Sequence, residues 1–429
     1  MIRTRILRHA TCLIAACLSV SSLSVYADET EDEFDENPMV INNPGSVVER
    51  VNEDYKDEDY LFKIPGGSKL LDPWKKFKSK LAEEQAFKFG VSYTSYYQKT
   101  SNNNLGPEDD AASYDLDISG NWAFMKRGTG SEGLLGFSLF KRDSYGSKMP
   151  PQRLFSQVGS LYSSAAPYGE NDFVLGEFWI QKKFDNRWGF RVGKLFPITA
   201  YDFFPFKNFR TDFVDFNNVT NAAIPLPGNG YGAFVQFRPA PRLMMRLGVH
   251  DANADVEKSG IDTWDGETFK IFEVHWDTGL VPRTPGKPPA GVVAFRIWQQ
   301  DERDDFNIDD GWGISGTYSQ RVGRITPYVR LSYADVEADG PTPVELAAST
   351  GIVIDGIFGQ ANDRIGIGYT WSDPSDSRLD HENMIDAYYR VQVTPTIEFS
   401  PTIEYIHEPV RDPEEDSTII WGARARIAF

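Results

Sequence analysis

The chain has 429 residues, a formal net charge of −18 at pH 7 and a negative mean hydropathy. A chain this acidic is a poor partner for nucleic acid. Its two cysteines, Cys12 and Cys17, both lie near the N-terminus, so neither a disulfide framework nor thiol chemistry is expected in the rest of the chain. Beyond residue 27 no stretch approaches the ~20 consecutive apolar residues of a membrane helix.

The first 27 residues have the pattern of an export signal. Three arginines precede an apolar run over residues 10–20, and residues 25–27 place small side chains where a signal peptidase cleaves. Residues 14–17 also resemble a lipoprotein box, an alternative that would leave a shorter apolar core. We expect a signal peptide over residues 1–27.

Residues 28–67 are dominated by acidic side chains. The stretch 28–62 holds thirteen acids against two bases, with Asn-Pro breaks between them. Because such a composition buries little apolar surface, we expect residues 28–67 to be disordered.

A short amphipathic helix is predicted over residues 68–86. Asp72 and Pro73 have the features of an N-cap and a first helical residue. Apolar side chains then recur at helical spacing among lysines, at Trp74, Phe77 and Leu81. We expect a periplasmic helix packed against a barrel mouth, and a plug or a wall contact is the alternative.

From residue 87 onward the hydrophobic period changes from 3.6 to 2, which indicates strands. Sixteen alternating segments are predicted, at 87–98, 114–125, 133–142, 174–184, 187–196, 231–238, 243–251, 269–277, 290–300, 311–321, 325–335, 350–358, 364–372, 383–394, 396–406 and 417–429. Their connections alternate between tight turns and long loops, as in bacterial outer-membrane barrels. We therefore predict an all-β fold, a transmembrane antiparallel β-barrel of sixteen strands over residues 87–429.

The two parities of these segments differ in chemistry. One carries apolar side chains, including Phe89, Val91, Tyr93, Leu116, Ile118, Phe178, Ile180, Val192, Leu247, Val249, Ile367, Tyr369 and Phe399. The other carries charges of both signs. A β-sandwich would also alternate, with its apolar face inside. The signal-like N-terminus, the even strand number and the aromatic Phe429 at the end of the last segment favour the barrel, and Phe429 is the expected contact for the barrel-assembly machinery.

Sixteen strands leave a water-filled lumen, so passive diffusion of a solute is the expected function. Residues 198–230 interleave aromatic rings with charges and are expected to fold into the lumen as a constriction; packing at the rim or at a subunit contact is the alternative. Rings suit the C–H faces of sugars, and paired arginines and carboxylates suit their hydroxyls. The candidate pore-lining residues are Glu177, Arg191, Lys207, Arg210, Arg246, Glu273, Arg296, Trp298 and Arg330.

Several motifs in order resemble the carbohydrate-selective porin family of the OprB type. They are Phe190–Leu195, Gly248–Ala252, Asn362–Gly368, Tyr389 and Pro401–Ile406, and the resemblance spans roughly residues 74–429. It implies a sixteen-stranded porin of the bacterial outer membrane that passes small sugars through an arginine-lined eyelet. Lys194, Asp386 and Glu404 depart from the family pattern of Arg, Glu and Gln at these positions.

Other functions are less consistent with the sequence. An outer-membrane enzyme would need a nucleophile with an oriented histidine; beyond residue 27 the histidines are His250, His275, His381 and His407, and no Gly-x-Ser-x-Gly or paired-His motif occurs. Asp251, Asn253 and Asp255 begin like a calcium loop, but Val256 replaces its glycine. We expect no cofactor and no metal. A general or weakly cation-favouring porin remains the nearer alternative, and either a homo-trimer or a monomer is compatible with the sequence.

Overall fold

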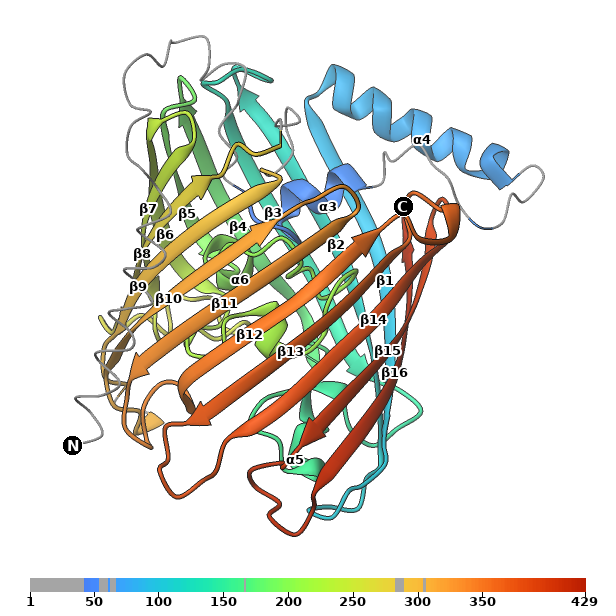
Figure 1. Cartoon of the computed structure of the whole chain (residues 1–429). Coiled ribbons are helices and arrows are strands. Elements are labelled where there is room, and N and C mark those ends of the chain that lie inside the picture. The colour runs from blue at the N-terminus through green and yellow to red at the C-terminus, as the bar shows by residue number, and fades with distance from the viewer. Residues whose placement is uncertain (1–41, 54–60, 62–66, 166, 282–288, 304–305) are drawn as a thin grey trace.

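Sixteen antiparallel strands close into one barrel in the computed structural model, which describes residues 42–53, 61, 67–165, 167–281, 289–303 and 306–429 (Figure 1). Each strand pairs with its neighbours in sequence, and β1 pairs with β16 to complete the ring. The predicted fold class is therefore confirmed. The predicted signal peptide, residues 1–27, lies outside the described residues.

The strands and helices have the following bounds. The strands are β1 (Phe87–Thr100), β2 (Asp110–Met125), β3 (Gly133–Ser144), β4 (Asn171–Phe184), β5 (Trp188–Leu195), β6 (Gly230–Ala240), β7 (Leu243–Asp251), β8 (Thr268–Asp277), β9 (Gly291–Gln300), β10 (Gly311–Gln320), β11 (Ile325–Asp335), β12 (Val344–Asp355), β13 (Arg364–Pro374), β14 (Glu382–Thr394), β15 (Ile397–His407) and β16 (Ser417–Ala428). The helices are α3 (Val47–Glu53), α4 (Gly67–Glu84), η1 (Pro151–Arg153), α5 (Phe155–Val158), α6 (Pro197–Ala200), α7 (Phe216–Val219) and η3 (Ile357–Gly359).

All sixteen predicted segments correspond to strands, and the largest difference is at β12. That strand begins at Val344, six residues before the predicted start at 350. Its first residues contain small side chains and follow a proline, so they do not alternate clearly. They become a strand because β11 and β13 pair with them on both sides, which overrides the weak local preference.

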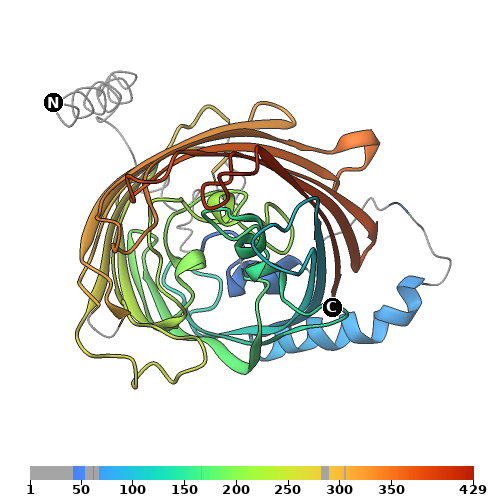
Figure 2. The same ribbon diagram turned by 90° about the horizontal axis from the view of Figure 1, so that it is seen from below.

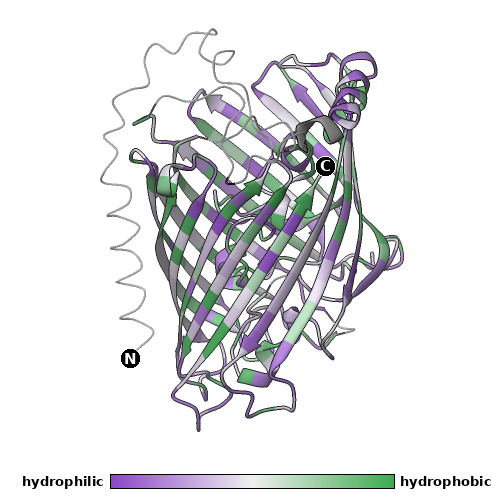
Figure 3. Ribbon diagram, turned by 90° about the vertical axis from the view of Figure 1, so that its right-hand side faces the viewer, coloured by the Kyte–Doolittle hydropathy of each residue, from purple (hydrophilic) through white to green (hydrophobic). Residues whose placement is uncertain are grey.

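The parity of the strands places apolar side chains outside and charged ones inside. Val235 and Leu247, which face each other across β6 and β7, are 52% and 57% exposed. Arg246 and Gln236, on the opposite parity of the same strands, are buried. Apolar and polar residues alternate along the strands in Figure 3. This pattern is the reverse of a sandwich with an apolar core, so the sandwich alternative is excluded.

Helix α4 lies outside the barrel, against β1 (Figure 2). The ring of Trp74 meets Phe89 edge to face, with 5.4 Å between centroids, and Lys78 lies 5.6 Å above the same phenyl ring. The helix begins at Gly67, before the predicted N-cap at Asp72, and Pro73 lies inside it. Within the part of the chain that the structure describes, no helix is both long and apolar enough to cross a membrane.

Helix α3 lies inside the barrel, on the opposite side of the same wall from α4 (Figure 2). It belongs to residues 28–67, which were expected to be disordered, and for residues 42–53 the structure differs from that expectation. Residues 42–53 hold only two acids, and Val47 and Val51 of α3 are fully buried, so this part of the stretch has apolar as well as charged contacts inside the barrel. Leu61, further along, donates its backbone N–H to the carbonyl of Gln392 in β14 at 2.9 Å.

Candidate functional site

The loop between β5 and β6, residues 196–229, lies within the ring of strands (Figure 2). Tyr201, Phe204 and Phe213 have no exposed surface. Phe204 and Phe213 pack edge to face on Tyr328 of β11, with centroid separations of 4.8 and 6.1 Å. Several aromatic rings of this loop therefore attach it to the wall.

Asp202 is the main ionic anchor of the first half of the β5–β6 loop. Its carboxylate lies 3.2 Å from Arg296 of β9 and 2.9 Å from Arg330 of β11. Lys207 lies 3.9 Å from it and donates to the carbonyls of Tyr201 and Asp202 at 2.9 and 2.7 Å. Burial lowers the pKa of the Lys207 ammonium to about 7, although Asp202 acts in the opposite direction.

Glu273 of β8 is a second centre of charge on the same wall. It lies 3.4 Å from Arg246 of β7 and 3.1 Å from Arg296 of β9. Arg246 also donates to Gln236 of β6 at 2.8 Å and to the carbonyl of Ala200 in the loop. Because side chains at facing register positions share one face, β6 to β9 present these groups as one continuous band.

Arg210 anchors the middle of the loop to the opposite wall. Its guanidinium lies 2.6 Å from Asp115 and 3.4 Å from Asp117, both on β2. Asp115 also pairs with Arg142 of β3 at 2.7 Å. The positive charge of Arg210 is therefore compensated by the wall that it contacts.

Two arginines of the wall bind backbone carbonyls in the middle and the second half of the loop. Arg330 donates to the carbonyl of Asn218 at 3.0 Å. Arg424 of β16 donates to the carbonyls of Phe209 and Asp212 at 2.6 and 2.8 Å. The path of the loop across the lumen is thus fixed by side chains from β9, β11, β2 and β16.

A second loop, residues 145–170 between β3 and β4, also enters the lumen, and sequence reasoning missed this role. Tyr168 donates to the carbonyl of Phe209 at 3.2 Å, and its ring packs edge to face on the Phe209 ring. Ser160 donates to Glu382 of β14 at 2.8 Å. The loop has no obvious sequence signal, because these contacts join residues more than forty positions apart.

The remaining predicted residues take different positions. Glu177 of β4 accepts from the indole of Trp179 at 3.2 Å. Arg191 of β5 stacks on the Trp179 ring at 4.0 Å and donates to Gln181 at 2.6 Å. Trp298 lies in a buried apolar cluster, 6.4 Å from the Phe269 ring, and not among the charges. Of the other predicted residues, Lys207 and Arg210 belong to the β5–β6 loop, and the wall residues Glu177, Arg191, Arg246, Glu273, Arg296 and Arg330 contact this loop or residues 42–53.

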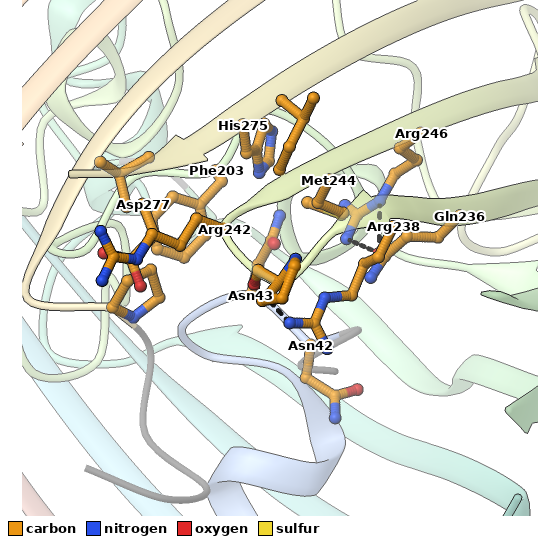
Figure 4. Close-up of a pocket in the computed structure, with 14 residues that line it drawn as sticks. Asn42, Asn43, Phe203, Gln236, Arg238, Arg242, Met244, Arg246, His275 and Asp277 are labelled. Carbon is orange, nitrogen blue, oxygen red and sulfur yellow. Dashed lines mark hydrogen bonds between the residues drawn. The ribbon is translucent and has the colours of Figure 1, made fainter. Parts of the chain in front are cut away.

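A pocket opens beside the loop on the side of the β6–β7 turn (Figure 4). The ring of Phe203 forms one side, 5.7 Å from the imidazole of His275. The polar lining comes from three parts of the chain and consists of Asn42, Asn43, Gln236, Arg238, Arg242, Arg246, His275 and Asp277. An aromatic ring beside amide and guanidinium groups suits a small polar solute. No cluster of acidic, histidine or cysteine side chains that could hold a metal ion occurs among the described residues.

The closed sixteen-stranded barrel, apolar outside and charged inside, defines a porin of the bacterial outer membrane. The chain belongs to the carbohydrate-selective porin, OprB family, whose sequence profile matches residues 143–429. The family and the fold are those of a channel.

Individual relatives are distant. Porin AaxA of Chlamydia trachomatis serovar L2 is 21% identical over 278 residues, which cover 63% of this chain. The chain spans only 58% of the length of that relative. The solved high-pH structure of Pseudomonas putida OprB superposes with a TM-score of 0.64 at 16% identity, covering 83% of this chain and 97% of that one. This likeness supports the fold.

Proposed function

We propose that this porin passes small neutral carbohydrates by passive diffusion, through a water-filled lumen that the β5–β6 loop narrows. The observation that carries the proposal is the band of arginines and carboxylates in direct contact with an aromatic loop. Arg246, Glu273, Arg296 and Asp202 form one continuous chain of ion pairs, in which each successive pair is separated by 3.1–3.4 Å. The family to which the chain belongs is consistent with this solute class.

The charge balance of the site favours neutral solutes over anions. A channel for phosphate or other anions needs cations that remain uncompensated in the constriction. Here Lys207 and Arg210, the cations of the β5–β6 loop, pair with Asp202, Asp115 and Asp117. Because both cations are compensated, an anion gains no net attraction there, whereas a neutral polyol can use the polar groups that line the pocket beside the loop.

The pocket of Figure 4 supplies a candidate contact surface for the solute. The phenyl ring of Phe203 can cover one C–H face of a sugar ring, while Gln236 and Arg246 lie beside it as hydrogen-bonding groups. Passage requires that such contacts remain few and weak, because a tightly bound solute would not leave. We therefore expect weak, saturable sugar binding.

Liposome swelling tests this function directly. Vesicles containing the purified porin are diluted into isotonic glucose, maltose, a neutral amino acid or a phosphate ester. We expect glucose to enter faster than a neutral amino acid of similar size, and the phosphate ester to enter slowest. Equal rates for solutes of equal size would instead show a general porin, and no swelling would exclude an open channel.

Substitution of Arg246 by lysine tests whether Arg246 contacts the sugar or only holds the β5–β6 loop in place. Lysine keeps the positive charge but loses the planar fork that contacts Gln236 and Glu273 together. We expect the ratio of glucose to amino acid entry to fall while amino acid entry is maintained. The exposed Lys99→Ala change, at a surface ion pair with Asp109, serves as the control.

A further inference from the structure

We propose that residues 42–53, with α3 at their centre, are a resident part of the channel. In this proposal they narrow the lumen on the side of the barrel where β1 begins, and so set how much ion and solute the pore passes. The inference rests on the porin fold and not on the preference for sugars. It concerns a segment outside residues 143–429, the part of the chain that matches the family profile.

Arg50 attaches α3 to the lumen wall. Its guanidinium lies 3.4 Å from Asp117 of β2 and 3.2 Å from Glu177 of β4, and it donates to Ser119 of β2 at 3.0 Å. The Arg50 side chain is only 5% exposed. A buried arginine that loses its carboxylate partners is strongly destabilising, so these contacts hold the helix in place.

The segment also touches the β5–β6 loop. The side-chain amide of Asn43 donates to the carbonyl of Tyr201 at 3.0 Å. Arg191 of β5 donates to the side chain of Asn42. Residues 42–53 therefore contact both the wall, at β2 and β4, and the β5–β6 loop that crosses the lumen.

One carboxylate couples the two lumen elements. Asp117 lies 3.4 Å from Arg50 through one oxygen and 3.4 Å from Arg210 of the β5–β6 loop through the other. Displacement of Arg50 would leave Asp117 with Arg210 as its one ion-pair partner among the described residues, beside hydrogen bonds from Ser119 and Ser138. The position of α3 and the hold on the β5–β6 loop are therefore linked through a shared acid.

The same segment completes the pocket described above. Asn42 and Asn43 form the side of the pocket that faces Gln236, Arg246 and Phe203 (Figure 4). Val47 of α3 is fully buried in the main apolar cluster of the barrel. Val47 therefore anchors the segment by apolar burial, and Arg50 anchors it by buried ion pairs. Asn42 and Asn43 line the pocket. These contacts are those of a fixed part of the channel.

Single-channel conductance in potassium chloride measures the effect without any sugar. The full-length protein is compared with a deletion of residues 42–53 and with Arg50→Glu, which places a third acid between Asp117 and Glu177. We expect the conductance to rise roughly twofold in both variants, because current follows the open cross-section of the pore. Lys80→Glu, an equal charge reversal on α4 outside the barrel, should leave the conductance unchanged.

Rescue distinguishes release of α3 from damage to the barrel. Combining Arg50→Glu with Glu177→Arg restores an ion pair of reversed polarity and should return the conductance towards the wild-type value. Heat-modifiable gel mobility confirms that each variant is a folded barrel. Wild-type conductance in folded Arg50→Glu protein would overturn the proposal, even if the deletion variant fails to fold. A rise in conductance with equal swelling for all solutes would support it and refute only the sugar preference.

Discussion

Helices α3 and α4 are neighbours in the chain but lie on opposite sides of the barrel wall, and different chemistry holds each one. Inside, α3 is held by Arg50 between two buried carboxylates and by the fully buried Val47 and Val51. Outside, α4 is held by the rings of Trp74 and Phe77 against Phe89. The wall is one layer of backbone thick, yet its two faces select opposite kinds of side chain.

The comparison shows that the segment inside the barrel is held by charge pairs together with buried valines, whereas the segment outside is held by aromatic rings. In a soluble domain an acidic stretch such as residues 28–67 has no core to join. In a large barrel the lumen offers paired charges at fixed positions, so Arg50 finds acids already in place. Four substitutions, with expected effects that decrease from the first to the last, can test how strongly the lumen and the outer face differ in the side chains they tolerate.

Asp202→Ala removes the acid shared by three lumen cations. Arg330 and Lys207 would lose a partner while still buried. We expect the free energy of unfolding to fall by about 3–5 kcal/mol, as when one member of a buried ion pair is removed. Urea titration in detergent micelles, followed by gel mobility, measures the change. Asp202→Asn should cost less, and a loss below about 1 kcal/mol for alanine would show that the lumen tolerates unpaired charge.

Val235→Arg places a charge on the outer face, at the middle of β6. Val235 is 52% exposed and faces the apolar Leu247 on β7. We expect a loss of about 2–4 kcal/mol in a lipid bilayer, the cost of an arginine near the bilayer midplane. Folding titrations into bilayers measure it, with Val235→Leu as the control. Equal stability of the arginine variant would mean that this face does not contact lipid.

Lys207→Met tests the buried lysine through the pH dependence of stability. Burial lowers the pKa of Lys207 to about 7, whereas an unfolded lysine titrates near 10.4. Between these pH values the unfolded chain holds the extra proton, so the wild-type stability should rise with pH by up to about 1.4 kcal/mol per unit. Below pH 7 this rise is absent. Methionine should flatten the profile between pH 7 and 9, and identical slopes would contradict the assignment.

Trp74→Ala should have the smallest effect of the four. It removes an edge-to-face contact with Phe89 that is worth about 0.5–1.5 kcal/mol beyond simple burial. We expect α4 to become sensitive to protease while the barrel and its conductance stay unchanged. Trp74→Phe is the matched control. Loss of the folded barrel would show that α4 supports the wall and does not merely rest on it.

The strands of the barrel wall could be predicted from the sequence, because the alternation of apolar and polar side chains depends only on adjacent residues. Val235 and Gln236 differ in parity, and every strand repeats that difference. The contacts of the lumen could not be predicted in this way. Asp202 meets residues 71 and 128 positions away, and Arg50 meets an acid 127 positions away. Sequence spacing carries no information on such pairs. Strand parity places the charged side chains on the lumen face, but it does not identify their ion-pair partners.

The seam between β1 and β16 has a consequence for synthesis. Val91 and Phe429 exchange two backbone hydrogen bonds, at 3.0 and 2.8 Å, across the whole length of the barrel sequence. β1 is the first strand of the barrel to be synthesised, and β16, its partner at this seam, is the last. Any chain that stops short of β16 leaves a long unpaired edge open to other chains. In such a chain the edges of both β1 and β15 would be free to pair with other strands.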